Sequence, residues 1–227
     1  MRNLRHFTLL LALIVAASTA SANAAESKNH QAKIRPDSNG WYSLFNGKDL
    51  TGWKTSEDHP DTFKVVDGQI VAHGKTCHLF YVGPVNHAKF KDFDWSCDIL
   101  TKPGSNSGMY FHTHYQPEGF PSTGIEAQID NSHSDPRRTG SLYQLKNIMN
   151  VSPAKDNEWF TQEVVVKGQH ITVKVNGKVV NQFTWPKGFQ REGGFKDNVL
   201  GSGTFALQGH DPNSEVHFRN IKVKPLP

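Results

Sequence analysis

Short stretches of alternating apolar and polar residues, separated by tight turns, constrain the fold of this chain more than any other feature. Asp67-Gly68 lies in the middle of one such stretch at residues 63–72, and Asn176-Gly177 lies in the middle of another at 171–180. Asp-Gly and Asn-Gly are the preferred two-residue turns of β-hairpins, because both turn positions need a left-handed backbone. The pattern therefore predicts two hairpins.

The rest of the chain from Trp41 onward continues this β pattern, and no segment keeps a helical apolar period over several turns. Further strands are expected at residues 92–100, 107–112, 125–130, 162–167, 204–208 and 215–223. Many short strands with Gly and Pro between them predict an all-β fold in which two antiparallel sheets pack as a sandwich, with a jelly roll as the favoured form. We expect less than about a fifth of the chain to be helical.

The N-terminus has the three parts of a secretory signal peptide. Arg2 and Arg5 give a positive start, residues 7–17 are apolar, and Ala22-Asn23-Ala24 supplies the small residues that a signal peptidase requires. The apolar run is shorter than the about 20 residues of a spanning helix, so no membrane span is predicted. We expect cleavage after Ala24 and a secreted or periplasmic protein.

This reading divides the chain into a signal peptide at residues 1–24, a flexible lead-in at 25–38 and a single domain at 39–227. The signal carries two of the 25 Lys and Arg residues and none of the 21 Asp and Glu residues, so the mature chain has 23 basic against 21 acidic side chains. Nucleic-acid binding is not expected, because no dense basic cluster is present.

Polar residues share one face of two predicted strands. Glu126, Gln128 and Asp130 alternate with apolar residues in one strand, and Tyr110 and His112 alternate with apolar residues in another. Side chains two residues apart point to the same side of a sheet. Such a face can hydrogen-bond sugar hydroxyls and hold a general acid or base. The alternative is the ordinary solvated side of an antiparallel sheet.

Several ordered motifs resemble the 3-keto-disaccharide hydrolase family. The sequence Leu-Phe-Asn-Gly-Lys-Asp-Leu-Thr-Gly-Trp at 44–53 resembles its opening signature. The other similar segments, which together span nearly all of the mature chain, are residues 90–94, 106–111, 124–130, 139–143, 207–211 and 216–221. The resemblance implies a concanavalin-like jelly roll, a carbohydrate as partner, and hydrolysis or elimination at a 3-keto-glycoside.

A ketone at C3 acidifies the hydrogen at C2, so the implied reaction needs a base, an acid and a group that stabilises the enolate. It does not need the two opposed carboxylates of an ordinary glycosidase. Glu126 and His210 are the expected acid–base residues. The residues expected to bind the substrate are His112, Gln128, Asp130, Tyr143 and Arg219. For Arg219, a surface ion pair is the alternative.

Two departures from the family pattern stand out. A basic residue, often Arg, commonly follows the Asn-Ser-Gly strand in the family, whereas this chain has His112 near that place and His114 after it. Residues 185–200 also resemble an insertion. The first departure implies a difference in pocket chemistry or substrate.

No cofactor is expected, with a bound metal as the alternative. His112 and His114 have a spacing that can chelate zinc or copper. Asp130, Asn131 and Asp135 offer oxygen atoms that suit calcium instead.

A non-catalytic carbohydrate-binding module is the other function class, because jelly rolls host both. Such a module would show exposed aromatic residues along a shallow groove. Trp185 is the best exposed candidate, whereas Trp53, Trp95 and Trp159 are expected to be structural.

Cys77 and Cys97 are the two cysteines of the chain. An oxidising compartment favours a disulfide between them, and two buried free thiols are the alternative.

Overall fold

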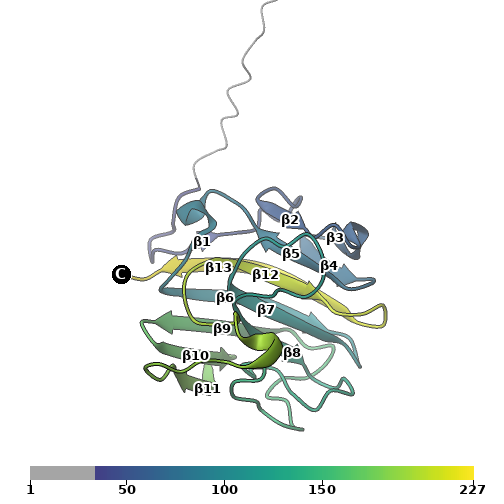
Figure 1. Cartoon of the computed structure of the whole chain (residues 1–227). Helices are drawn as coiled ribbons and strands as arrows, with labels where there is room; N and C mark the ends of the chain where they lie inside the picture. The colour runs from purple at the N-terminus through teal and green to yellow at the C-terminus, as the bar shows by residue number, and fades with distance from the viewer. Residues whose placement is uncertain (1–33) are drawn as a thin grey trace, which may run out of the picture. The chain divides into compact units, whose positions relative to one another are not determined.

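A computed structural model describes residues 34–227, which form two antiparallel β-sheets packed face to face (Figure 1). The expected signal peptide at residues 1–24 and residues 25–33 of the expected lead-in lie outside the described residues, so both stay predictions. Within residues 34–227, no helix has the length and apolar character needed to cross a bilayer.

The larger sheet has eight strands: β1 (Tyr42–Ser43), β3 (Phe63–Val66), β4 (Gln69–His73), β6 (Phe93–Thr101), β9 (Phe160–Lys167), β10 (His170–Val175), β11 (Lys178–Thr184) and β13 (Glu215–Pro225). They are ordered β11-β10-β9-β6-β13-β4-β3, with β1 paired to β13.

The smaller sheet has five strands: β2 (Trp53–Thr55), β5 (Cys77–Tyr81), β7 (Asn106–Thr113), β8 (Ile125–Asp130) and β12 (Thr204–Gly209). They are ordered β2-β5-β12-β7-β8. In the described part of the chain, the only helical elements are short 3-10 turns at Pro60–Thr62, Val85–Ala88 and Gly193–Phe195. The prediction of an all-β, two-sheet antiparallel sandwich is confirmed.

Both predicted hairpins are present. The first turn has φ values of 49° at Asp67 and 74° at Gly68, and the second has 50° at Asn176 and 75° at Gly177. Two successive left-handed residues give the tight turn whose twist matches the flanking strands. The turns set the register of β3 on β4 and of β10 on β11.

The core lies between the two sheets and depends on aromatic contacts that cross it. The Trp95 ring of β6 stacks on Phe205 of β12 with 4.3 Å between ring centroids, and Phe90 stacks on the same ring at 4.5 Å. Trp53 and Trp95 are both buried, as predicted.

Trp185 is buried rather than exposed, so it is not the exposed aromatic residue that the alternative of a binding module would need. Only 9 % of the residue is accessible. Its ring packs at 5.9 Å from Phe183 and 5.2 Å from Phe189, which cover the end of β11.

The favoured disulfide between Cys77 and Cys97 is absent, and both thiols are free and buried. The two residues lie in different sheets, because Cys77 belongs to β5 and Cys97 to β6. The Cys77 thiol contacts the Ser56 hydroxyl at 3.2 Å. Burial raises the pKa of each thiol, which keeps both uncharged.

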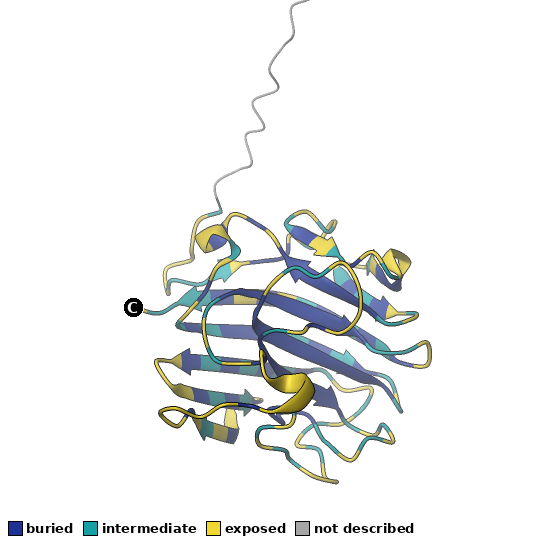
Figure 2. Ribbon diagram, viewed as in Figure 1, coloured by how far each residue is buried: buried dark blue, intermediate teal, exposed yellow. Residues whose placement is uncertain are grey.

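The strands β7, β8 and β12 are buried along their whole length, as Figure 2 shows in dark blue. One face of these strands meets the core, and loops cover the other face. Residues 139–143 also run along the outer edge of β8, where the amide of Gln128 donates to Ser141 O at 2.9 Å and the amide of Tyr143 donates to Glu126 O at 3.0 Å. The smaller sheet is therefore enclosed on both faces and along this edge.

Candidate functional site

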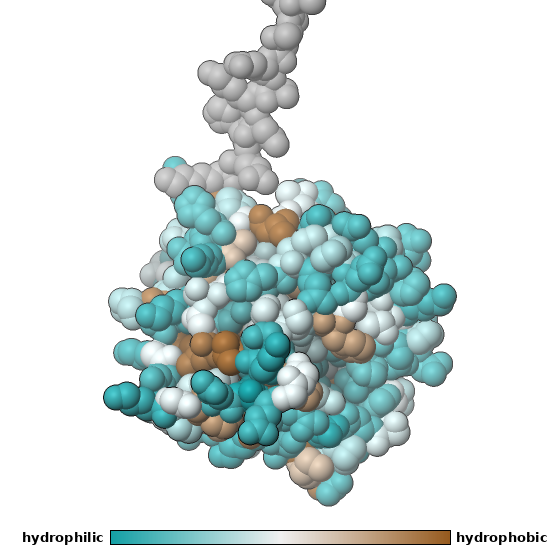
Figure 3. All heavy atoms as spheres, viewed as in Figure 1, coloured by the Kyte–Doolittle hydropathy of each residue, from teal (hydrophilic) through white to brown (hydrophobic). Residues whose placement is uncertain are grey.

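A pocket of about 400 Å³ opens on the loop-covered face of the smaller sheet. The loop between β11 and β12, green to yellow in Figure 1, crosses in front of this sheet. The same side of the molecule is mostly hydrophilic, with small groups of hydrophobic side chains (Figure 3). The lining residues are Asn106, Tyr110, Phe120, Pro121, Ser122, Gly124, Glu126, Gln128, Asp135, Tyr143, Arg191, Gly194, Phe195, Asn198, Gln208 and His210.

Strand alternation directs the central acid of the pocket. Ile125 and Ala127 of β8 enter the core, so Glu126 between them points to the opposite face. Tyr110 of β7 lies directly across from Glu126 in the register. Gly108 makes room for the carboxyl group, because a Cβ atom there would lie 2.2 Å from Glu126 Oε1.

Glu126 is a buried carboxyl group held by a short chain of hydrogen bonds. The Tyr110 hydroxyl donates to Glu126 Oε2 at 2.9 Å, and Gln208 Nε2 donates to the Tyr110 oxygen at 3.1 Å. Burial raises the pKa of Glu126 to about 8 despite the Tyr110 hydrogen bond, which acts in the opposite direction. Glu126 is therefore mainly a neutral acid at pH 7.

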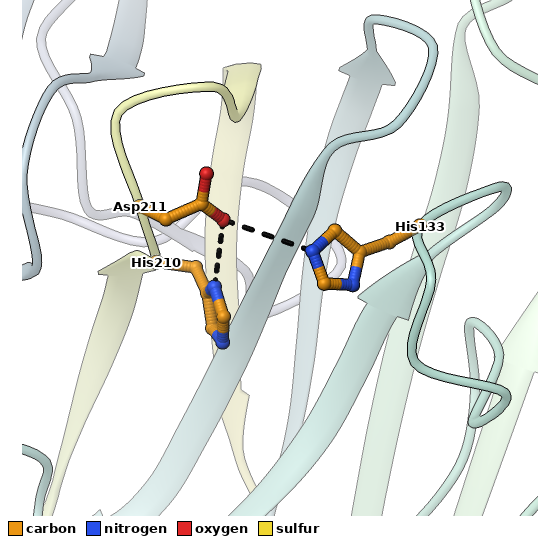
Figure 4. Close-up of side chains that lie close together, drawn as sticks. All are labelled: His133, His210 and Asp211. Atoms are coloured by element: carbon orange, nitrogen blue, oxygen red, sulfur yellow. Dashed lines mark hydrogen bonds and ion pairs between the residues drawn. The ribbon is translucent and has the colours of Figure 1, made fainter.

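His210 is oriented by the carboxylate of the next residue (Figure 4). His210 Nδ1 lies 2.8 Å from Asp211 Oδ2, and Ser214 Oγ donates to the same oxygen at 2.7 Å. Burial alone would raise the pKa of Asp211, but these hydrogen bonds hold it below its usual range. The carboxylate favours a proton on His210 Nδ1, which leaves the Nε2 lone pair for the pocket.

His133 approaches Asp211 from the other side, with its Nε2 atom 3.9 Å from Asp211 Oδ2 (Figure 4). Together, His133, His210 and Asp211 have ligand-type atoms close enough to hold a metal ion. However, the amide of Asp135 donates to His133 Nδ1 at 3.1 Å, which favours a proton on Nε2. A metal would need a lone pair at that atom, so this tautomer of His133 does not fit a metal centre.

The floor beside this cluster contains His78, which is fully buried on β5. Its ring centroid lies 5.5 Å from that of Tyr110 and 5.5 Å from that of Phe120, and neither ring nitrogen has a hydrogen-bond partner among the described residues. Burial lowers the pKa of His78 to about 3, and His210 acts in the same direction. His78 therefore stays neutral and adds to the apolar environment beneath Tyr110.

Residues 40–224 match the model of the 3-keto-alpha-glucoside-1,2-lyase-like domain. The chain belongs to this family. The match includes both sheets and every residue that lines the pocket.

Relatives of this 3-keto-alpha-glucoside-1,2-lyase-like chain include a protein of Bacteroides thetaiotaomicron named 3-keto-disaccharide hydrolase. The two are 23 % identical over 253 residues, covering 91 % of this chain and 84 % of the relative. A solved structure from Parabacteroides distasonis, named as a glycosyl hydrolase, has a TM-score of 0.69 at 25 % identity, covering 83 % of this chain and 95 % of that one. A carbohydrate binding module from Bacillus subtilis shares the fold, with a TM-score of 0.50 at 16 % identity over 75 % of this chain and 94 % of that one.

Four of the predicted site residues line the pocket of this domain. They are Glu126, Gln128, Tyr143 and His210. Gln128 is anchored by a hydrogen bond of 3.1 Å from its Nε2 atom to Asn106 Oδ1. The alternation of β8 therefore placed its first two polar residues correctly.

His112 does not join them, contrary to prediction. The pairing of β7 with β12 shifts register beside His112, whose φ is 56°, so the strand bulges there. The bulge turns the ring toward the Lys91 carbonyl, 2.8 Å from Nε2, and the Gly201 amide, which donates to Nδ1 at 3.1 Å. Both ring nitrogens are thus occupied, which argues against the alternative of a metal pair with His114.

Asp130 also lies outside the pocket, because its carboxylate binds the loop that follows β8. Asp130 Oδ1 accepts from Arg138 at 2.7 Å and from the His133 amide at 2.9 Å. Asp135 Oδ2 pairs with Arg137 at 2.8 Å. Both carboxylates are engaged by arginine, which makes the alternative calcium ligands Asp130, Asn131 and Asp135 a poor set for a cation.

Arg219 belongs to β13 of the larger sheet and cannot reach the pocket. Its guanidinium lies 3.8 Å from the centre of the Trp159 ring and near Asp98. The surface alternative applies to Arg219, and Trp159 is partly buried beneath its guanidinium.

Sequence reasoning missed several polar residues that build or support the pocket, among them Asn106, His133, Arg191, Asn198, Gln208 and Asp211. Gln208 could have been found, because β12 alternates core residues Phe205 and Leu207 with the opposite face. The others sit in loops or at strand ends, where a two-residue period gives no signal.

Proposed function

We propose that this chain is a secreted or periplasmic enzyme that cleaves the glycosidic bond of 3-keto-glycosides, including disaccharides. The observation that carries the proposal is one pocket containing a neutral carboxylic acid, Glu126, and an imidazole with a free Nε2 atom, His210. The family match and the Bacteroides relative named 3-keto-disaccharide hydrolase support the substrate class.

The proposed elimination uses the two groups in one step. His210 Nε2 takes the proton from C2, the electron pair of that C–H bond forms the C1=C2 double bond, and the C1–O bond breaks. Glu126 gives its proton to the departing oxygen, so the products are an unsaturated 3-keto sugar and an alcohol. Adding water across the double bond would complete a hydrolysis.

The enolate character that develops at the C3 oxygen needs donors in a pocket that excludes water. The amide of Gln128 and the hydroxyl of Tyr143 line the pocket and are proposed to bind this oxygen or the neighbouring hydroxyls. Asp211 is proposed to stabilise the imidazolium that forms on His210, because its carboxylate already accepts a hydrogen bond from His210 Nδ1.

A non-catalytic binding module remains the second candidate, since the fold is shared with a carbohydrate binding module. Two observations favour the enzyme: the site is a loop-covered pocket rather than an open groove, and Trp185 is buried. A raised carboxyl pKa beside a positioned imidazole is also more useful for proton transfer than for binding.

The test is cleavage of 3-keto-trehalose or a 3-keto-glucoside, followed by NMR, with Glu126→Gln as the variant. We expect turnover to fall by about 10²–10⁴ because the acid proton is lost while the shape remains. A melting curve at pH 4, where the carboxyl group is mainly protonated in both the folded and the unfolded chain, should change little. Unchanged turnover in the folded variant would exclude Glu126 from the chemistry.

The variant Glu126→Gln also tests how turnover and stability depend on pH. A pKa near 8 in the folded state, against 4.5 for an ordinary Glu, means that folding favours the protonated form. Turnover should therefore fall as the pH rises through about 8. The native protein should also lose stability between about pH 4.5 and 8, while Glu126→Gln should not. A pH–rate profile in which turnover does not decline above about pH 8 would contradict the role of Glu126 as the general acid.

A further inference from the structure

Arg191 is a buried cation in the pocket wall with no acidic partner among residues 34–227. It lies in the loop between β11 and β12 and is 9 % exposed. The neighbouring Arg137 and Arg138 pair with Asp135 and Asp130, whereas Arg191 forms no ion pair within the described residues. An uncompensated buried charge costs free energy, so its presence in a pocket needs an explanation.

The contacts of Arg191 hold it in position without neutralising it. Nη1 donates to Asn198 O at 3.1 Å and Nη2 donates to Tyr143 O at 3.2 Å, and both acceptors are neutral carbonyls. The guanidinium also lies 4.8 Å from the centre of the Phe195 ring. A guanidinium has five N–H donors, so these two bonds leave donors for a ligand.

No carboxylate in the pocket is available to balance this charge. Burial keeps the pKa of Glu126 at about 8, so Glu126 is mainly neutral at pH 7. Asp135 accepts two hydrogen bonds from Arg137 Nη1, at 3.0 and 2.8 Å. The pocket wall around Arg191 therefore has a positive charge, and a ligand with a negative group would neutralise this charge.

Arg191 and His210 both line the pocket, and residues 120–121 connect them along its rim. Phe120 contacts His210, with 6.0 Å between ring centroids. Asn198, which accepts from Arg191, donates to the carbonyl of Pro121 at 3.3 Å. The rim thus runs from His210 through residues 120–121 to Arg191, so a sugar that reacts at His210 would extend another part toward Arg191.

We propose that Arg191 forms a subsite for a carboxylate carried by the glycoside, which makes acidic glycosides the preferred ligands of this pocket. The inference rests on the proposed function only in taking the ligand to be a glycoside. A planar carboxylate suits the fork of a guanidinium, which can donate two parallel hydrogen bonds to it.

The test measures binding without turnover, by isothermal titration of the full mature chain with two unoxidised probes. They are 4-carboxyphenyl β-D-glucopyranoside and its neutral match, 4-carbamoylphenyl β-D-glucopyranoside. We expect the acid to bind about 10- to 100-fold more tightly, the range for hydrogen bonds between charged groups. Arg191→Met should remove this preference, and Arg191→Lys should keep part of it.

Each other outcome overturns the subsite. No preference in the wild-type protein, or a preference that survives in Arg191→Met, would mean that the carboxylate is not bound by Arg191. Equal weakening of both probes in Arg191→Met would assign Arg191 to holding the loop, and a melting curve of that variant would show the same loss of structure.

Cleavage assays on the 3-keto forms of the two probes keep this inference separate from the proposed function. An intact binding preference without cleavage would remove the proposed reaction and leave the subsite. An equal loss of turnover on both keto probes in Arg191→Met, with the binding preference unchanged, would place Arg191 at the reacting oxygen and overturn the subsite.

Discussion

The outward faces of the two sheets contain similar residue types, yet the pocket that holds Glu126 and His210 lies over the smaller sheet. On the larger sheet, Glu163 of β9 pairs with Lys174 of β10 at the surface. On the smaller sheet, Glu126 is covered by loops, has no cationic partner in contact and has a pKa of about 8. The difference shows that the covering loops, more than the strand sequence, turn a polar sheet face into a chemical site.

The strongest way to break this comparison is to replace one histidine on each face. His210→Gln should lower turnover by about 10²–10⁴, because Gln cannot accept the C2 proton. His217→Gln is the matched control, since His217 lies on the larger sheet and, among residues 34–227, its side chain bonds to Gln69 and Glu215. Steady-state cleavage of a 3-keto-glucoside checks both variants. Similar losses in the two would mean that the faces do not differ in function.

A smaller change tests how closely the covered face is packed around Glu126. Gly108→Ala places a methyl group where Glu126 Oε1 now lies, so the carboxyl must move. We expect turnover to fall by about 10²-fold, the effect of misplacing a reacting group by about 1 Å. Gly201→Ala is the control, because nothing lies within 4 Å of its added Cβ. Full activity of Gly108→Ala at unchanged stability would contradict the packing argument.

The smallest effect is expected on the open face of the larger sheet. Arg219→Met removes the contact with Trp159 and should lower the free energy of unfolding by about 0.5–1 kcal/mol, as for exposed cation–π pairs. Turnover should not change. Denaturant unfolding and the cleavage assay measure the two quantities, and a tenfold loss of turnover would return Arg219 to the list of substrate-binding candidates.

The two-residue period and the turn residues of the sequence predicted the features that depend on residues close together in the chain. The alternation of β8 gave the direction of Glu126 and Gln128, and the two Gly-containing turns gave both hairpins. A two-residue period identifies the face of a strand but not the sheet to which the strand belongs. Arg219 was therefore grouped with residues that lie across the core from it.

The remaining errors arise from long-range structure. The bulge at His112 depends on how β12 pairs with β7, and those strands are about 90 residues apart in sequence. Both Trp185 and Arg191 belong to the segment at residues 185–200 that resembles an insertion. The path of this segment over the smaller sheet depends on its contacts with Tyr143 and Pro121. Neither feature leaves a periodic signal.

Residues 139–143 have a further consequence for the molecule in a crowded solution. An exposed edge strand offers unpaired N–H and C=O groups to other chains and invites aggregation. These residues already bond to the backbone of β8 at Gln128 and Glu126, so that edge is closed to a strand from a second molecule. The strand that carries the pocket acid is thereby kept from self-association that would bury the pocket.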